Sequence, residues 1–171
     1  FNGALIERVG LLKDLDVGVI DTVLADRITL MPGAPALVST MKANGAYAAL
    51  VSGGFTAFTV AVSAQLRFDE NRANTLSVKG GKLTGAVGEP ILGRAAKVQA
   101  LEEITNKLGI STQDVMAVGD GANDLGMLKI AGTGAALHAK PAVAAECLVR
   151  INFCDLSALL FIQGYPRATF V

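Results

Sequence analysis

The stretch VMAVGDGANDLGML, residues 115–128, decides how the fold is interpreted. Its apolar start predicts a short buried strand, the glycines around Asp120 break that strand, and two leucines mark one side of a following helix. Open parallel sheets bind ligands at such breaks, beyond the carboxyl ends of their strands. We therefore expect the polar side chains of Asp120, Asn123 and Asp124 at a ligand-binding edge.

Two interpretations fit these polar residues. Asn123 or Asp124 is suited to cap the helix, and an acidic first turn suits the helix dipole. Alternatively, clustered carboxylates require a cation or hydrogen-bond donors nearby, and hard ions such as Mg²⁺ prefer oxygen ligands. Spacing alone leaves both interpretations open.

The composition limits the classes of function. The 171 residues suffice for one domain with a sizeable core. Fifteen acidic residues balance fifteen basic ones, so neither nucleic acid nor membrane is an expected partner. Residues 45–66 lack charge and imitate a membrane span, but their Ser-Gly-Gly interruption favours a buried strand, a turn and a buried helix. Cys147 and Cys154 are expected to be buried thiols in a reducing cytoplasm.

The first part of the chain is predicted to be helical. Apolar spacing indicates helices over 1–12 and 15–28, and Pro32 in the following linker prevents continuation. We therefore expect a small helical unit over 1–29 and an α/β body over 30–171.

Two cations interrupt the apolar faces of helices. Arg8 lies in the stripe of the first helix, and Lys97 lies in that of a helix predicted over 93–108. Taken alone, each is interpreted as a side chain whose charged end reaches water. The functional alternative is that Arg8 binds a carboxylate through its planar fork, and that Lys97 binds an anion.

A further candidate anion site follows an apolar strand predicted over 46–51. The Ser-Gly-Gly turn at 52–54 leads into a helix that extends to Leu66. Such a turn exposes backbone N–H groups at a helix N-terminus. The alternative is that Ser52 only caps this helix.

One bound phosphate would explain these features together. An uncompensated buried lysine and a bare pair of carboxylates are each costly. Lys97, Ser52 and Gly53 can hold phosphoryl oxygens, while Asp120 holds a metal ion that neutralises the developing charge.

The rest of the pattern completes the α/β body. His138, the single histidine, is interpreted as a surface or packing residue, and Asp155 as the N-cap of the last helix. The further predicted elements are a β-hairpin with arms 72–78 and 83–87, strands over 134–137 and 148–151, and helices over 141–147 and 155–161.

The sequence VGDGAND at 118–124 resembles the last signature motif of the haloacid dehalogenase superfamily, the aspartate-dependent phosphotransferases. Ser52 with Gly53 is similar to its second motif, and Lys97 to its third. The resemblance implies a three-layer α/β/α Rossmann-like core with a parallel sheet, plus a small helical cap.

The wider resemblance is to the phosphoserine phosphatase family and covers essentially the whole chain. It includes VSGGF at 51–55, VKGGKLTG at 78–85 and AKP at 139–141. It implies catalytic roles for Lys97, Asp120 and Asp124, substrate binding by Ser52, Gly53, Lys97 and Asn123, and Asp120 as a ligand of Mg²⁺.

The first nine residues, FNGALIERV, are similar to the family's cap segment. There a phenylalanine shields the substrate and an arginine binds the serine carboxylate, which implies these roles for Phe1 and Arg8. Asn2 and Ile6 depart from the family pattern, which usually has Glu and Arg, so the cap side matches less closely than the phosphate side.

The family's first motif, Asp-x-Asp-x-Thr on its first strand, is absent. Its first aspartate forms an aspartyl-phosphate, and its second acts as acid and base. The DLD sequence at 14–16 does not replace it, because it lacks the preceding apolar strand and the threonine. We therefore expect the sequence to be the downstream part of a longer chain, and to be inactive alone.

The resemblance implies Mg²⁺-dependent hydrolysis of O-phosphoserine to serine and phosphate in the cytoplasm, as the last step of serine biosynthesis. A homodimer is one option for the assembly. Two alternatives stay open: another phosphatase or phosphotransferase of the superfamily with a different small phosphomonoester, and a non-catalytic remnant that binds anions or partners.

Overall fold

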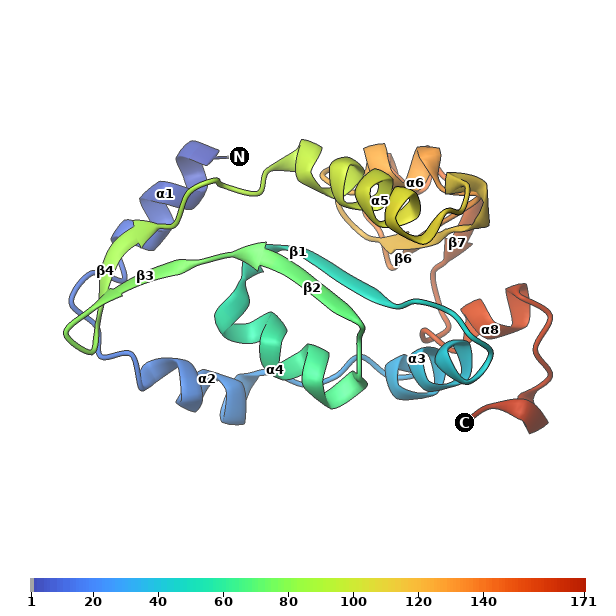
Figure 1. Ribbon diagram of the computed structural model, residues 1–171, viewed down its shortest axis with the longest axis horizontal. Coiled ribbons are helices and arrows are strands. Elements are labelled where there is room, and N and C mark those ends of the chain that lie inside the picture. The colour runs from blue at the N-terminus through green and yellow to red at the C-terminus, as the bar shows by residue number, and fades with distance from the viewer. Residues whose placement is uncertain (1) are drawn as a thin grey trace.

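The computed structural model describes residues 2–171, which begin with three helices and continue with a mixture of strands and helices (Figure 1). In chain order the elements are α1 (Asn2–Gly10), α2 (Val19–Arg27), α3 (Ala34–Ala43), β1 (Ala49–Phe55), α4 (Thr56–Leu66), β2 (Glu70–Asn74), β3 (Leu76–Lys79), β4 (Lys82–Val87), α5 (Arg94–Leu108), η1 (Thr112–Asp114), β5 (Met116–Gly119), α6 (Leu125–Ile130), β6 (Thr133–Leu137), α7 (Pro141–Ala144), β7 (Val149–Ile151), α8 (Ala158–Ile162) and η2 (Arg167–Thr169).

Parallel strands form the framework of the site. β1 pairs with β2, and β5, β6 and β7 pair in that order, all of them parallel. Parallel neighbours need a crossover, and α4 supplies it between β1 and β2, as α6 does between β5 and β6. The expected parallel α/β class is confirmed.

The β5–β6–β7 sheet is covered by helices on both faces. Ala136 points to a cluster with residues of α5 and α6, while its neighbour Ala135 points to a cluster with residues of α3 and α8. Both alanines are fully buried, which lets the helices approach the sheet closely. Figure 1 shows α5 and α6 on one side of β6 and β7, and α3 and α8 on the other. This is the predicted three-layer α/β/α arrangement.

β1 is longer than predicted because its glycines form an irregularity instead of ending the strand. The ladder with β2 is regular as far as Val51↔Arg72 and resumes at Phe55↔Asn74. Four steps along β1 therefore match two along β2, and the Ser-Gly-Gly sequence at 52–54 accommodates the excess. The N-cap of α4 is consequently Phe55, which contradicts the alternative interpretation that Ser52 only caps this helix.

β3 and β4 form the predicted antiparallel hairpin. At its tip, Gly80 and Gly81 have φ values of 60° and 76°, the left-handed pair that a two-residue type I′ turn requires. The first arm was predicted to begin too early, at residue 72, because residues 72–74 belong to β2 and lie beside β1 instead.

The apolar stripe of α1 is buried against this hairpin, where Val9, Leu76 and Leu83 form one cluster. The chain after α1 then pairs with β4: the Asp14 N–H donates to Leu83 O, and the Leu83 N–H donates to Leu15 O, both at 2.9 Å. Because residues 14–17 form backbone hydrogen bonds with the hairpin, α2 begins four residues later than predicted.

Two further local predictions need correction. The N-cap of α8 is Ser157, and Asp155 instead accepts the Ser157 N–H at 2.8 Å through Oδ1. Cys147 is buried as predicted, but Cys154 is exposed.

No helix within residues 2–171 is both long and apolar enough to cross a membrane, and the uncharged segment 45–66 forms β1 and α4.

Candidate active site

The centre of the site is an ion pair between Lys97 of α5 and Asp124, the residue before α6. Asp124 is only 2% exposed, and the Lys97 side chain keeps 14% of its surface. Asp124 Oδ1 accepts from Lys97 Nζ, and Oδ2 accepts the backbone N–H groups of Asp120 at 3.1 Å and Gly121 at 2.9 Å. The buried carboxylate therefore fixes the lysine and the loop at the same time.

Two glycines make this arrangement sterically feasible. A Cβ at Gly119 would lie 2.5 Å from Asp124 Cβ and Cγ, so only glycine lets this carboxylate fold back under the loop. A Cβ at Gly126 would lie 2.8 Å from a methyl carbon of Val98. α5 and α6 thus approach closely enough for the lysine of one helix to reach the N-cap of the other.

Asp124 occupies the predicted N-cap position without capping α6 through its side chain. Asp120 is exposed on the same loop, and Asn123 is half-buried. Because Asp124 already has three donors, Asp120 is the carboxylate of this loop that is available to an external ligand.

Asp120 fits one ligand position of a hard cation, since it is an exposed residue with two carboxylate oxygens. Within residues 2–171, no group of three or more His, Cys, Asp or Glu side chains is arranged to hold a metal ion. A complete Mg²⁺ site at Asp120 would therefore require additional oxygen ligands.

Ser52 and Gly53 lie in the irregular part of β1. The Ser52 hydroxyl accepts the Gly54 N–H at 2.9 Å, so one donor of the expected anion site is bonded within the turn. The Gly53 carbonyl accepts from Asn74 Nδ2 at 3.0 Å.

Asn74 connects this turn with the helix that carries Lys97. Its Oδ1 accepts the N–H of Leu92, two residues before α5, at 2.7 Å. The structure thereby brings the second and third motif segments together through a residue that the sequence analysis missed. A single asparagine in a supposed hairpin arm gives no sequence signal of such partners.

The cap-side residues are less closely connected with this centre. Arg8 is exposed in the last turn of α1, and Phe1 lies outside the described residues. A Cβ at Gly93 would lie 3.3 Å from Asn2 Oδ1, so the start of α1 lies beside the residue that precedes α5. Within residues 2–171, no hydrogen bond or ion pair joins Arg8 to Lys97 or Asp120.

A charged network fixes the second half of α5 to β2. Arg72 donates to Glu70 at 2.5 Å and also to Glu103 of α5. The Tyr47 hydroxyl donates to Glu70 at 2.9 Å. The hydrogen bond from Arg72 is the main cause that lowers the pKa of Glu70 below its ordinary value, and it lowers the pKa of Glu103 in the same way.

We expect acid to remove the stabilisation that this network provides. Because the pKa of Glu70 is lower in the folded chain than in the unfolded one, the unfolded chain takes up the proton first as the pH falls. The contribution is complete above the unfolded value, about pH 4.3, and is lost as the pH falls through the folded value. In urea titrations between pH 7 and pH 3, the free energy of unfolding of the native chain should therefore fall more steeply than that of Arg72→Met.

The matched control for this prediction is Lys79→Met, which removes an exposed cation from the hairpin. Its free energy of unfolding should depend on pH in the same way as that of the native chain. Parallel curves for the native chain and Arg72→Met would contradict the prediction.

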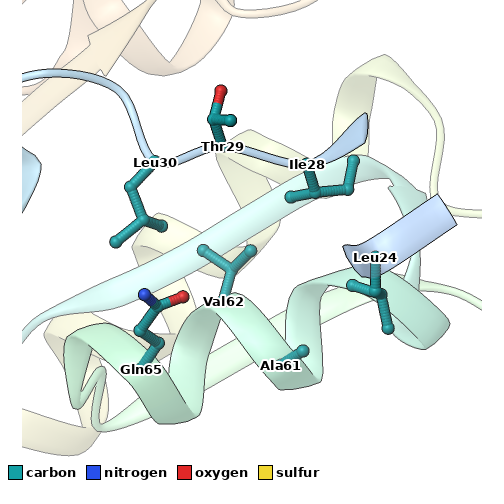
Figure 2. A pocket seen from close by; sticks show the side chains of 7 residues that line it. All are labelled: Leu24, Ile28, Thr29, Leu30, Ala61, Val62 and Gln65. Atoms are coloured by element: carbon teal, nitrogen blue, oxygen red, sulfur yellow. The ribbon is translucent and has the colours of Figure 1, made fainter. Parts of the chain in front are cut away.

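Two hollows lie away from the ion pair. Figure 2 shows the first, of about 380 Å³, in which Leu24, Ile28 and Leu30 face Ala61, Val62 and Gln65 of α4. No charged side chain lines it, so it does not suit an anionic substrate. The second, of about 600 Å³, is lined by residues between the end of β6 and the segment after β7, including His138, Arg150 and Asn152. Neither hollow is lined by Lys97 or Asp120. The candidate site is therefore identified from hydrogen-bonded and ion-paired groups, and not from a cavity.

Comparisons with known proteins agree with the α/β fold. A family model described as haloacid dehalogenase-like hydrolase matches residues 3–129. A phosphoserine phosphatase from Streptomyces coelicolor is 41% identical over 167 residues, which are 98% of this chain and 40% of that protein. A phosphoserine phosphatase from Polaromonas sp. is 42% identical over 164 residues, 94% of this chain and 70% of that protein.

A solved substrate-bound phosphoserine phosphatase has a TM-score of 0.90 and 40% identity to this chain. The likeness covers 95% of this chain and 77% of that one. The chain spans about half the length of several curated relatives that it matches.

Proposed function

The chain belongs to the haloacid dehalogenase-like hydrolases, and within them to the phosphoserine phosphatase family, and we propose that its site hydrolyses O-phosphoserine to serine and phosphate. The observation that supports this most is the buried Lys97–Asp124 pair on a loop that exposes Asp120. An anchored ammonium beside an available carboxylate suits a phosphoryl group and its metal ion.

Each residue of the site has a distinct proposed role. Lys97 neutralises the charge that develops on the phosphoryl oxygens, and Ser52 and Gly53 donate hydrogen bonds to the same oxygens. Asn123 binds the substrate from the side of the loop. Asp124 is a positioning residue, because its carboxylate already has three donors and holds both the Lys97 ammonium and the backbone of the loop that carries Asp120.

Asp120 would hold Mg²⁺ together with carboxylates that the described residues do not provide. When bound, the ion supplies neutralisation of phosphoryl charge and a fixed orientation of the substrate. We propose that the two aspartates of the family's first motif complete this set. One attacks phosphorus and breaks the bond to the serine oxygen, and the other protonates that oxygen and then activates the water that releases phosphate from the aspartyl-phosphate.

The edges of the sheets support this role for an additional strand. Within residues 2–171, β1 pairs only with β2, and β5 pairs only with β6. Each therefore has an edge that can accept the strand that carries the first motif. We further propose that residues 1–29 are part of a cap over the core of residues 30–171, and that the protein serves serine biosynthesis in the cytoplasm.

The central test uses a chain that contains both this sequence and the first motif. It should release phosphate from O-phosphoserine when Mg²⁺ is present and lose this activity in EDTA, whereas the 171-residue chain alone should release none. Asp120→Asn should lower kcat by roughly 10²–10³-fold, as expected for the loss of a preorganised charge. Asp26→Asn, an exposed change on α2, is the control, and an Asp120→Asn variant with native activity would refute the proposal.

Arg8→Met should distinguish recognition of the serine part from phosphate chemistry. Losing a charged hydrogen bond of about 1.5–3 kcal/mol should raise KM for O-phosphoserine at least tenfold and leave hydrolysis of p-nitrophenyl phosphate unchanged. Arg27→Met, which removes an exposed cation at the end of α2, should change neither the KM for O-phosphoserine nor the hydrolysis of p-nitrophenyl phosphate. Equal effects of Arg8→Met on the two substrates would rule out a carboxylate-binding role.

A further inference from the structure

Asn74, the last residue of β2, is one of the most deeply buried polar residues, with 1% of its surface exposed. Its amide makes three hydrogen bonds to backbone groups of two other segments. Nδ2 donates to Gly53 O at 3.0 Å and to Leu92 O at 3.5 Å, and Oδ1 accepts the Leu92 N–H at 2.7 Å. A buried amide is tolerated only when it is satisfied in this way.

The two segments that Asn74 joins are those that we propose to hold the phosphoryl group. Gly53 lies in the irregular part of β1, where the ladder to β2 is interrupted until the pair Phe55↔Asn74. The Asn74 side chain bonds the carbonyl in this interruption. Leu92 lies five residues before Lys97, in the segment that leads into α5. One planar amide therefore sets the distance between the glycine turn and the helix of the lysine.

We propose that Asn74 is a positioning residue of the phosphoryl site, which keeps the Ser52–Gly53 turn and the Lys97 helix at the separation that the transition state requires. This inference rests on the proposed function. Asn74 contacts neither substrate nor metal in this scheme and acts only through the backbone at Gly53 and Leu92. Displacement of a bound group by about 1 Å can lower a rate roughly 100-fold, so a small shift of either segment is sufficient.

The sharpest variant is Asn74→Asp, which keeps the size of the side chain and the acceptor for the Leu92 N–H. It replaces the Nδ2 donor by an oxygen that faces the carbonyls of Gly53 and Leu92, so the two segments should move apart. Asn71→Asp is the matched control. It lies on the same strand, and the Asn71 oxygen that accepts from Thr59 at 3.1 Å is retained.

The experiment measures hydrolysis of O-phosphoserine and binding of inorganic phosphate, in the chain that also carries the first motif and at a temperature well below the unfolding midpoint of each variant. Asn74→Asp should lower kcat roughly 100-fold with a smaller change in KM, and weaken phosphate binding about tenfold. Asn71→Asp should change neither. If Asn74→Asp does not fold, the uncharged Asn74→Ser, whose shorter side chain cannot bridge both segments, replaces it with the same expected direction.

Native kcat and native phosphate affinity in a folded Asn74 variant would overturn the positioning role, as would equal losses in Asn71→Asp. If the native protein binds phosphate without hydrolysing O-phosphoserine, the proposed function fails, and phosphate affinity alone decides the role of Asn74. If the native protein does neither, both proposals are overturned.

Discussion

Lys97→Met is expected to reduce hydrolysis of O-phosphoserine roughly 10³-fold, the largest effect among single side chains of this site, because it removes the anchored positive charge from the phosphoryl oxygens. The measurement is kcat under saturating substrate in a chain that carries the first motif. Lys107→Met is the matched control, since it removes an exposed lysine from the same helix. A Lys97→Met protein with native kcat would exclude this lysine from phosphate chemistry.

The same substitution leaves Asp124 buried without its cation. Loss of one partner from a buried pair costs ~3–5 kcal/mol, so the free energy of unfolding must be measured in the same variant and the rates compared where both proteins are folded. If Asp124 acts only through Lys97, the double change Lys97→Met with Asp124→Asn should be little worse than Lys97→Met alone. Multiplicative losses would show that Asp124 also acts through its bonds to the backbone of Asp120 and Gly121.

Gly119→Ala is expected to destabilise the chain by ~2–4 kcal/mol and to abolish the activity with it. The new methyl group would lie 2.5 Å from Asp124 Cβ and Cγ. That side chain cannot move away easily, because Lys97 and two backbone N–H groups hold its carboxylate. Urea unfolding gives the stability of the variant directly, and it can be performed on the 171-residue chain.

Gly3→Ala provides the control for this prediction, since it adds the same methyl group to α1, where no heavy atom lies within 4 Å. It should be neutral or slightly stabilising, because alanine favours a helix. A Gly119→Ala chain as stable as Gly3→Ala would mean that Asp124 is not held as described.

The sequence predicted the parts of the site that local patterns specify. Lys97 was singled out because its charge interrupts an apolar stripe, and Asp120 and Asp124 because they cluster where a predicted strand breaks into a helix. Their catalytic roles stay predictions. The succession of strand-like and helix-like apolar patterns predicted the α/β class. The bonds of Asp124 to Lys97 and to the loop could not be predicted, since they depend on how closely α5 and α6 approach at Gly126.

Other features were missed because they depend on pairing between distant segments. The glycines of 52–54 are typical of a turn, yet pairing with β2 keeps them in β1. Residues 72–74 alternate like a hairpin arm, yet they lie beside β1. Asn74 is the clearest case, because its partners at Gly53 and Leu92 are 21 and 18 positions away.

The two parallel sheets share no backbone ladder within residues 2–171. The outward amides of β1 and β5 therefore lack a partner strand, and they should exchange with deuterium faster than those of β6, which is bonded on both sides. Such open edges also promote pairing between molecules. The concentration at which this chain is stored and assayed will thus determine how much of it stays free of aggregates.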